Sequence, residues 1–160
     1  MASWQRTLCA GFGGGVALNL VMLLTFRLLG FGVDGHGILI TSPLQSAKLI
    51  AVWTSLEPLP RIVNQPLGMI LGLVLLGVAH AFLYRMSTPS WPSGVGPRAA
   101  RLFLWLFAGF AFWEFFTPFN LLGEPLGLIA LEMLFWGLIA AAEALVITTL
   151  MERGSSASSP

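Results

Sequence analysis

The residues best suited to chemistry are three glutamates and a histidine that interrupt long apolar stretches. Glu114 lies in the segment FWEFFTPFN among five aromatic residues, and Glu132, Glu143 and His80 lie in runs that are otherwise apolar. A charged carboxylate near the centre of a lipid bilayer costs about 2.5 to 3.5 kcal/mol. We therefore expect each of these side chains to be protonated, paired, or facing a wet cavity.

The spacing of these groups predicts two polar layers. Glu132 and Glu143 are eleven residues apart, which is three helical turns that close to within about 20°, so both carboxyls lie on one face of a helix. Antiparallel helices would bring Glu114 to the depth of Glu132, with Arg27 within reach. They would bring His80 to the depth of Glu143. Glu114, Glu132 and Arg27 form the predicted outer layer. His80 and Glu143 form the inner one.

The two layers admit more than one role. Histidine is the side chain that titrates nearest to neutral pH, so His80 and the carboxyls could hold and pass a proton. Intramembrane polar groups also serve as interhelical hydrogen bonds, each contributing about 0.6 to 2 kcal/mol, and an ion pair between Arg27 and Glu132 would then be architectural. Contact with a partner subunit or a cofactor is the third alternative, and the sequence leaves all three open.

The sequence contains no strong motif for metal, cofactor or enzymatic chemistry. Asp34 and His36 in DGHG offer two ligands, which are too few for a metal site. His80 has no second intramembrane histidine with which to form a bis-histidine haem site. Walker loops, nucleophile elbows, zincin pairs and dinucleotide fingerprints are missing from the sequence. We therefore expect no metal site, no cofactor and no enzymatic activity.

The composition is that of an all-α, polytopic integral membrane protein. Of the 160 residues 9% are charged and 56% are hydrophobic, whereas about 25% of the residues in a soluble domain are charged. Segments inside a bilayer must bond their own backbone groups, so they form helices. The net charge of +1 and the scattered basic residues do not fit a protein that binds nucleic acid.

Four apolar segments are long enough to cross a bilayer, which takes about 20 residues. They form one four-helix transmembrane domain, residues 1–153, with spans at about 8–29, 67–86, 100–118 and 125–150. Between the first two spans, Ser42 and Pro43 are suited to begin a short helix over about 43–57, which we expect to be interfacial or re-entrant. The polar residues 154–160 are expected to be disordered.

Glycines at helical spacing predict close contacts between spans. Gly11, Gly15 and Asn19 lie four residues apart on one stripe of the first span, and Gly68 and Gly72 open the second. Small residues at this spacing let two helix backbones approach, and an amide on the same stripe can bond across the contact. We expect these stripes to pack inside the bundle, with homodimerisation through one of them as the alternative.

Positive charges near the spans predict the orientation. One side carries Arg6, Arg85, Arg98, Arg101 and Arg153, and the other carries Arg27, Lys48 and Arg61. Cytoplasmic loops are enriched in such residues. Both termini are therefore expected in the cytoplasm, with the protein in a bacterial inner membrane.

Small size and faces suited to helix contacts favour a non-enzymatic accessory or scaffold subunit of a membrane assembly. Its partners would be the lipid bilayer and other membrane subunits or copies of itself. The alternative is a small oligomeric transporter or channel, linked to protons through the intramembrane carboxylates.

Overall fold

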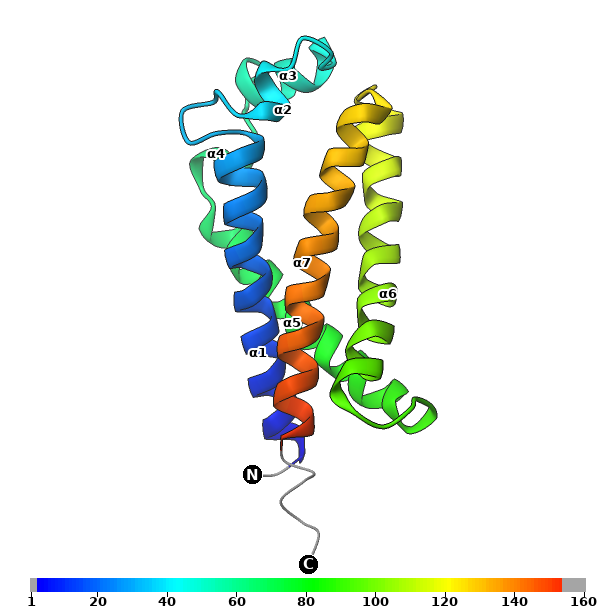
Figure 1. Ribbon diagram of the computed structural model, residues 1–160. Helices are drawn as coiled ribbons and strands as arrows, with labels where there is room; N and C mark the ends of the chain where they lie inside the picture. Colours follow the sequence, from blue (N-terminus) through cyan, green and yellow to red (C-terminus); the bar gives the residue numbers. More distant parts are fainter. Residues whose placement is uncertain (1–2, 154–160) are drawn as a thin grey trace, which may run out of the picture.

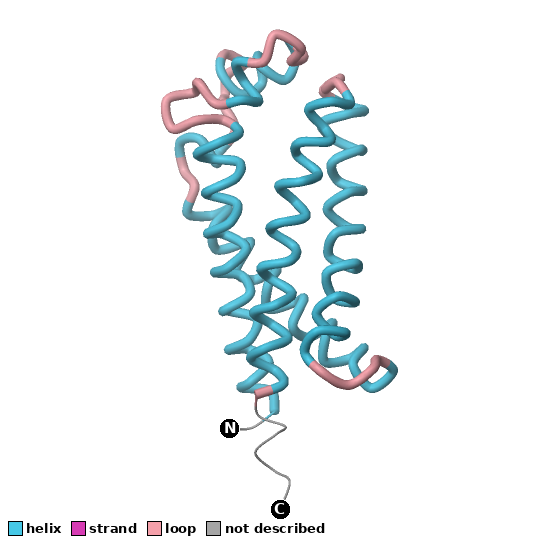
Figure 2. Tube along the Cα trace, viewed as in Figure 1, coloured by secondary structure: helices cyan, strands magenta, loops and turns pink. Residues whose placement is uncertain are grey.

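The computed structural model describes residues 3–153, and the regular secondary structure of this part of the chain is entirely helical, without strands; loops connect the helices (Figure 2). Within it, four helices are long and apolar enough to cross a membrane. They are α1 (Ser3–Met22) continued by the π-helical η1 (Leu23–Gly30), α5 (Leu67–Ser87) continued by η2 (Thr88–Ser90), α6 (Val95–Glu114) continued by the π-helical η3 (Phe115–Leu121), and α7 (Leu126–Glu152). The four predicted spans and the all-α class are confirmed. The predicted tail, 154–160, lies outside the described residues.

The long helices pack in the spatial order α5, α1, α7, α6, so α1 and α7 occupy the middle (Figure 1). Helix α5 crosses behind the other helices, and its C-terminal part joins α6 and α7. The core lies there, around Leu18, Tyr84, Leu102, Ile139 and Ile147. Helix α1 begins and α7 ends at the same end of the bundle (Figure 1), which we call the terminal end; the other is the loop end.

Glycines bring the backbones of α1 and α5 into direct contact. A Cβ atom added at Gly15 would lie 2.6 Å from the Cα atom of Val74, and Gly11 and Gly77 are equally crowded by backbone atoms of the other helix. Asn19 donates one hydrogen bond to the carbonyl of Gly15 within its own helix, at 2.8 Å, and another across the contact to the carbonyl of Ile70 on α5, at 3.3 Å. The predicted packing role of Gly11, Gly15 and Asn19 is confirmed.

The second glycine pair does not pack in the bundle, contrary to the prediction. A Cβ atom at Gly68 or Gly72 would have no neighbour within 4 Å. Gly72 is two residues from Val74, about 200° around the helix, so the glycine pair lies opposite the face that contacts α1. Residues 61–72 are all exposed.

Two short helices, α2 (Ile38–Thr41) and α3 (Ala47–Thr54), lie at the loop end of the bundle, and a third, α4 (Arg61–Asn64), lies beside α1 (Figure 1). Helix α3 lies inside the predicted range 43–57 but begins four residues later. Residues 42–45 form a turn instead, because the N–H of Gln45 donates to the carbonyl of Ser42 at 3.0 Å. The side chain of Leu49 is buried, which fixes α3 against the rest of the protein.

A pair of glycine substitutions tests the contact between α1 and α5. Gly15→Ala should lower the free energy of unfolding by about 1 to 3 kcal/mol, because its Cβ meets backbone that cannot move aside cheaply. Gly72→Ala should change it by less than about 1 kcal/mol, since the added methyl group meets nothing. Reversible unfolding in mixed micelles measures both; equal effects of the two substitutions would contradict the described contact.

Candidate functional site

Three glutamates converge near the loop end of the bundle. One carboxylate oxygen from each of Glu114, Glu124 and Glu132 lies within 4.8 Å of the other two. Their side chains come from α6, from the turn after η3, and from α7, and all three residues are at most 3% exposed. We call these three residues the carboxyl cluster. The predicted proximity of Glu114 and Glu132 is confirmed, and Glu124 is an unpredicted third member.

The chain reverses between α6 and α7 in a way that turns Glu124 back toward α6. Pro118 has no N–H to donate to the carbonyl of Glu114, and the helix continues past it in wider π-helical turns. The turn then closes through a hydrogen bond of 3.0 Å from the N–H of Glu124 to the carbonyl of Pro118. Gly123, at φ +69°, takes the left-handed conformation that lets the chain reverse.

Two donors from outside the cluster hold its carboxylates. The indole N–H of Trp136 donates to Oε2 of Glu114 at 2.7 Å, and the amide Nε2 of Gln45 donates to Oε1 of Glu124 at 2.7 Å. The other oxygens of these two carboxylates, Oε1 of Glu114 and Oε2 of Glu124, are buried and have no hydrogen-bond partner among the described residues. Hydrogen bonds therefore orient these two carboxylates but leave one oxygen of each without a hydrogen-bond partner.

No cationic side chain among the described residues forms an ion pair with the cluster. Arg27, which was predicted in this layer, instead donates to the carbonyls of Gly32 and Val33, at 2.7 and 2.9 Å. The reason is that Arg27 lies in the last turns of η1, where the following loop offers unpaired carbonyl oxygens. The architectural ion pair between Arg27 and Glu132 is absent from the described structure.

The charge of the cluster must therefore be neutralised by something other than a side chain. Two unit charges about 4.8 Å apart repel by about 3.5 kcal/mol at an effective dielectric constant of about 20, and the cluster contains three such pairs. Three ionised carboxylates would also each carry a desolvation cost. Protons or a metal ion can neutralise such a site, and glutamate oxygens bind both.

The residues around the start of α3 connect the loop end to the cluster. Besides the bond from Gln45 to Glu124, the hydroxyl of Ser46 donates to the carbonyl of Leu122 at 2.6 Å, and the Nζ of Lys48 donates to the carbonyl of Leu121. We call residues 45–48 the latch. Its three side chains bind the turn that carries Glu124.

The latch and Glu124 were missed by sequence reasoning, although one signal was available. The connection FNLLGEP is short and joins two antiparallel helices that each carry a carboxyl. A glutamate in such a connection has to lie close to the ends of both helices. The partner Gln45 had no comparable signal, because it is 79 residues away in the chain.

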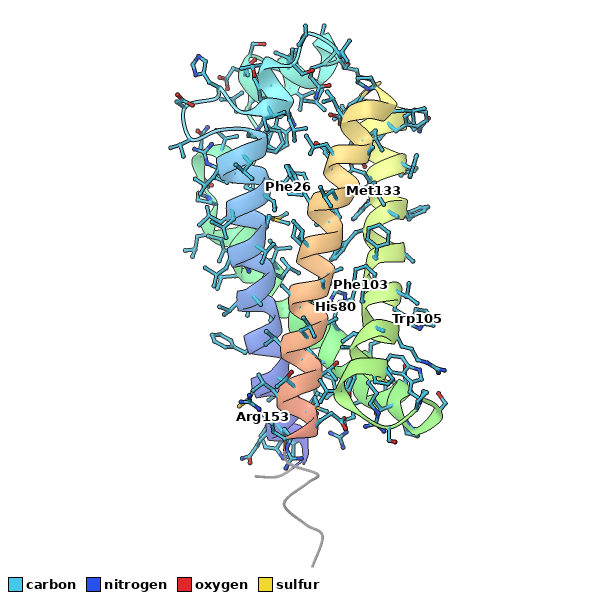
Figure 3. All side chains as sticks on the ribbon, viewed as in Figure 1. Phe26, His80, Phe103, Trp105, Met133 and Arg153 are labelled. Atoms are coloured by element: carbon cyan, nitrogen blue, oxygen red, sulfur yellow. The ribbon has the colours of Figure 1, made fainter. Side chains whose placement is uncertain are left out.

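The inner layer agrees with the prediction. The Nδ1 atom of His80 on α5 lies 2.8 Å from Oε1 of Glu143 on α7. Glu143 is fully buried, and its second oxygen has no partner among the described residues. Figure 3 labels His80 beside α7, nearer the terminal end than Phe26 and Met133.

Aromatic rings fill the space between the two layers. Trp136 stacks on Phe110 with 4.7 Å between ring centroids, and Phe26 packs against Trp136 at 5.0 Å. Trp136 thus contacts the carboxyl cluster through its N–H and the ring of Phe110 through its face. Phe110 in turn lies edge-on to His80, at 6.5 Å.

A separate polar group closes the terminal end. The hydroxyl of Tyr84 and the guanidinium of Arg98 both donate to Oε1 of Glu152, at 2.7 and 2.6 Å. These bonds join α5 and α6 to α7. All the groups are paired, so we assign this third group, which sequence reasoning did not identify, to holding the helices together.

The charge state of Glu124 should link pH to stability. Burial raises the pKa of the Glu124 carboxyl above its ordinary value of 4.5, and the negative charge of Glu114 adds to this effect, while the hydrogen bond from Gln45 opposes it. Because the pKa of Glu124 is higher in the folded state than in the unfolded state, protonated Glu124 stabilises the fold. This contribution is fully present at pH values below the ordinary pKa of a glutamate. This contribution is lost as the pH rises toward and through the raised value.

The prediction concerns the difference between the parent protein and Glu124→Gln. Between about pH 4 and pH 8 the melting temperature of the parent should fall relative to that of Glu124→Gln, whose amide does not titrate. Glu57→Gln, at an exposed loop position, should keep the trend of the parent. Thermal melts across this range check the expectation, and parallel curves for the parent and Glu124→Gln would contradict it.

The chain was also compared with known proteins. No protein-family model matches it, and neither the curated proteins nor the solved structures include a significant match.

Proposed function

We propose that this chain is a small membrane transporter or channel, linked to protons through the carboxyl cluster and the pair formed by His80 and Glu143. The observation that carries the proposal is the convergence of three buried carboxyls with which no cationic side chain of residues 3–153 forms an ion pair. Such a group must take up a proton or another cation to be stable in a low-dielectric surrounding. The same group can release that cation when access to water changes.

The geometry favours this role over a purely structural one. A structural polar group in a membrane bundle gains stability by pairing donors with acceptors, as Glu152 does with Tyr84 and Arg98. In the part of the chain that the structure describes, oxygens of Glu114, Glu124 and Glu143 instead stay buried without a hydrogen-bond partner. These unpaired oxygens cost stability, which is typical of sites that serve function.

The two sites lie on one helix at different depths. Glu132 and Glu143 are eleven residues apart on α7, which corresponds to about 16 Å along the helix axis. The aromatic residues Trp136 and Phe110 separate them, so a proton passing between the layers needs water or a side-chain movement at this point. We assign the gating step to these rings.

The proposed setting is a bacterial inner membrane with both termini in the cytoplasm. The support for this orientation is the excess of positively charged residues in and near the loops at the terminal end of the bundle. The carboxyl cluster and the latch would then lie toward the outer face, and His80 with Glu143 would lie toward the cytoplasm.

An accessory or scaffold subunit is the second candidate, and one observation favours it. Residues 61–72 are exposed throughout, and Gly68 and Gly72 present a stripe with no neighbour within 4 Å. Small residues on an open face suit contact with another membrane helix. The same face would serve the self-association of an oligomeric transporter, so the two candidates differ in whether the partner is a different protein.

Flux across liposomes tests the transport proposal. The parent protein should carry protons down an imposed gradient, and Glu132→Gln and Glu143→Gln should each lower the rate by about tenfold or more, because each removes a proton-binding group. Glu57→Gln should conduct like the parent. A parent without flux, or equal rates in all four proteins, would contradict the proposal.

Native mass spectrometry of lipid-preserving particles from the source membrane separates the two candidates. The transport proposal predicts a homo-oligomer with bound lipid. A different protein present at fixed stoichiometry, and lost in Gly72→Leu, would establish the accessory role instead. Gly109→Leu, at another uncrowded helical glycine, is the matched control.

A further inference from the structure

We infer that the carboxyl cluster binds a hard divalent cation, of the class of Mn²⁺, Mg²⁺ or Ca²⁺, in competition with protons. The inference rests on the proposed function, because it names the cation that the same site takes. It goes further in assigning a metal site where the sequence predicted none.

The ligand atoms and their spacing fit this class of cation. One carboxylate oxygen from each of the three glutamates lies within 4.8 Å of the other two, so a small shift of the side chains would place all three around one ion. Carboxylate oxygens are the preferred ligands of Mg²⁺, Ca²⁺ and Mn²⁺. The cluster contains neither the thiolate nor the imidazole that zinc and copper prefer, because His80 lies in the other layer.

A second observation, separate from the acidic composition, points to a ligand. Oε1 of Glu114 and Oε2 of Glu124 are fully buried without a partner, in residues that are 3% and 1% exposed. Donors from outside the cluster, the indole of Trp136 and the amide of Gln45, hold the other oxygen of each carboxylate. These bonds orient the carboxylates in the way that hydrogen bonds to metal ligands usually do.

Charge balance predicts an exchange of cations. If the empty cluster is neutral, its three carboxyls hold three protons. A divalent cation that enters while the cluster stays neutral displaces two of them, and the third proton remains. Metal affinity should therefore rise with pH, because protons and the metal compete for the same oxygens.

The latch lies directly against this site in the described structure. Gln45 contacts Glu124 directly, while Ser46 and Lys48 hold the backbone next to it. Gly32 and Gly35, both at positive φ, lie in the loop that leads to the latch. Opening of the latch would expose Glu124 first.

Titration of the full-length protein in lipid nanodiscs with Mn²⁺ tests the inference, with free Mn²⁺ measured by electron paramagnetic resonance. The parent should bind one ion per chain, more tightly at pH 8 than at pH 6. Glu114→Gln and Glu132→Gln should each weaken binding by at least about tenfold, since even changes next to a ligand cost 10- to 100-fold. Glu57→Gln should bind like the parent. A parent that binds no Mn²⁺, or that binds equally well without Glu114 or Glu132, overturns the inference.

A second readout keeps the test decisive if a glutamate variant fails to fold. Tb³⁺ bound at the cluster should show luminescence sensitised by the adjacent indole of Trp136. Trp136→Phe retains all three carboxylates but removes the N–H that holds Glu114, so it should lose most of this luminescence even at Tb³⁺ concentrations that saturate the site, while its affinity for Mn²⁺ falls by no more than about 100-fold. Trp113→Phe, an exposed indole on α6, should keep it. Equal luminescence in both tryptophan variants overturns the inference.

Proton flux measured on the same preparations separates this inference from the proposed function. Flux that depends on Glu132 in a protein without Mn²⁺ binding leaves the function standing and removes the metal site. Mn²⁺ binding that depends on Glu114 and Glu132 in a protein without proton flux leaves the metal site standing and removes the proposed function.

Discussion

A polar group inside a lipid bilayer has to find its hydrogen-bond partner within the protein, because the hydrocarbon offers none. The helical backbone of the spans follows from this constraint, and so do several local details. The side chain of Arg27 donates hydrogen bonds to carbonyls that follow η1, and the amide of Asn19 donates to the carbonyl of Gly15. Among the described residues, the buried side-chain oxygens without a hydrogen-bond partner belong to Glu114, Glu124, Glu143 and Thr148, and three of these four are carboxyl oxygens.

Helix α7 links these features. It packs against α1 on one side and α6 on the other, and it carries Glu132 toward the cluster, Glu143 toward His80 and Glu152 toward Tyr84 and Arg98. The contact of Glu152 with Tyr84 and Arg98 is paired and holds the helices together. The contacts of Glu132 and Glu143 belong to groups in which carboxyl oxygens have no described hydrogen-bond partner. One helix thus combines a stabilising polar contact at its end with two unsatisfied ones along its length.

The sequence was sufficient to predict what depends on periodicity and on the solvent. The four spans, the contact made by Gly11 and Gly15, and the pairings of Glu114 with Glu132 and of His80 with Glu143 all follow from helical spacing and equal depth. The contacts of Arg27, Gly68 and Gly72 could not be predicted from helical spacing and depth. They depend on which face of a helix meets which neighbour, and one sequence does not fix the rotation of a helix that is apolar on all sides. Glu124 and Gln45 meet through loops, whose paths depend on the completed fold.

The central claim is that three carboxyls share one buried site in which none of the described cationic side chains pairs with them. Infrared difference spectroscopy of the protein in lipid, without divalent cations and at neutral pH, tests it most directly through the C=O stretch of protonated carboxyl groups. Our account predicts a band from buried protonated carboxyls that weakens in Glu132→Gln, remains in Glu57→Gln, and diminishes when Mn²⁺ is added. A spectrum with only ionised carboxylates, unchanged in Glu132→Gln, would contradict the account.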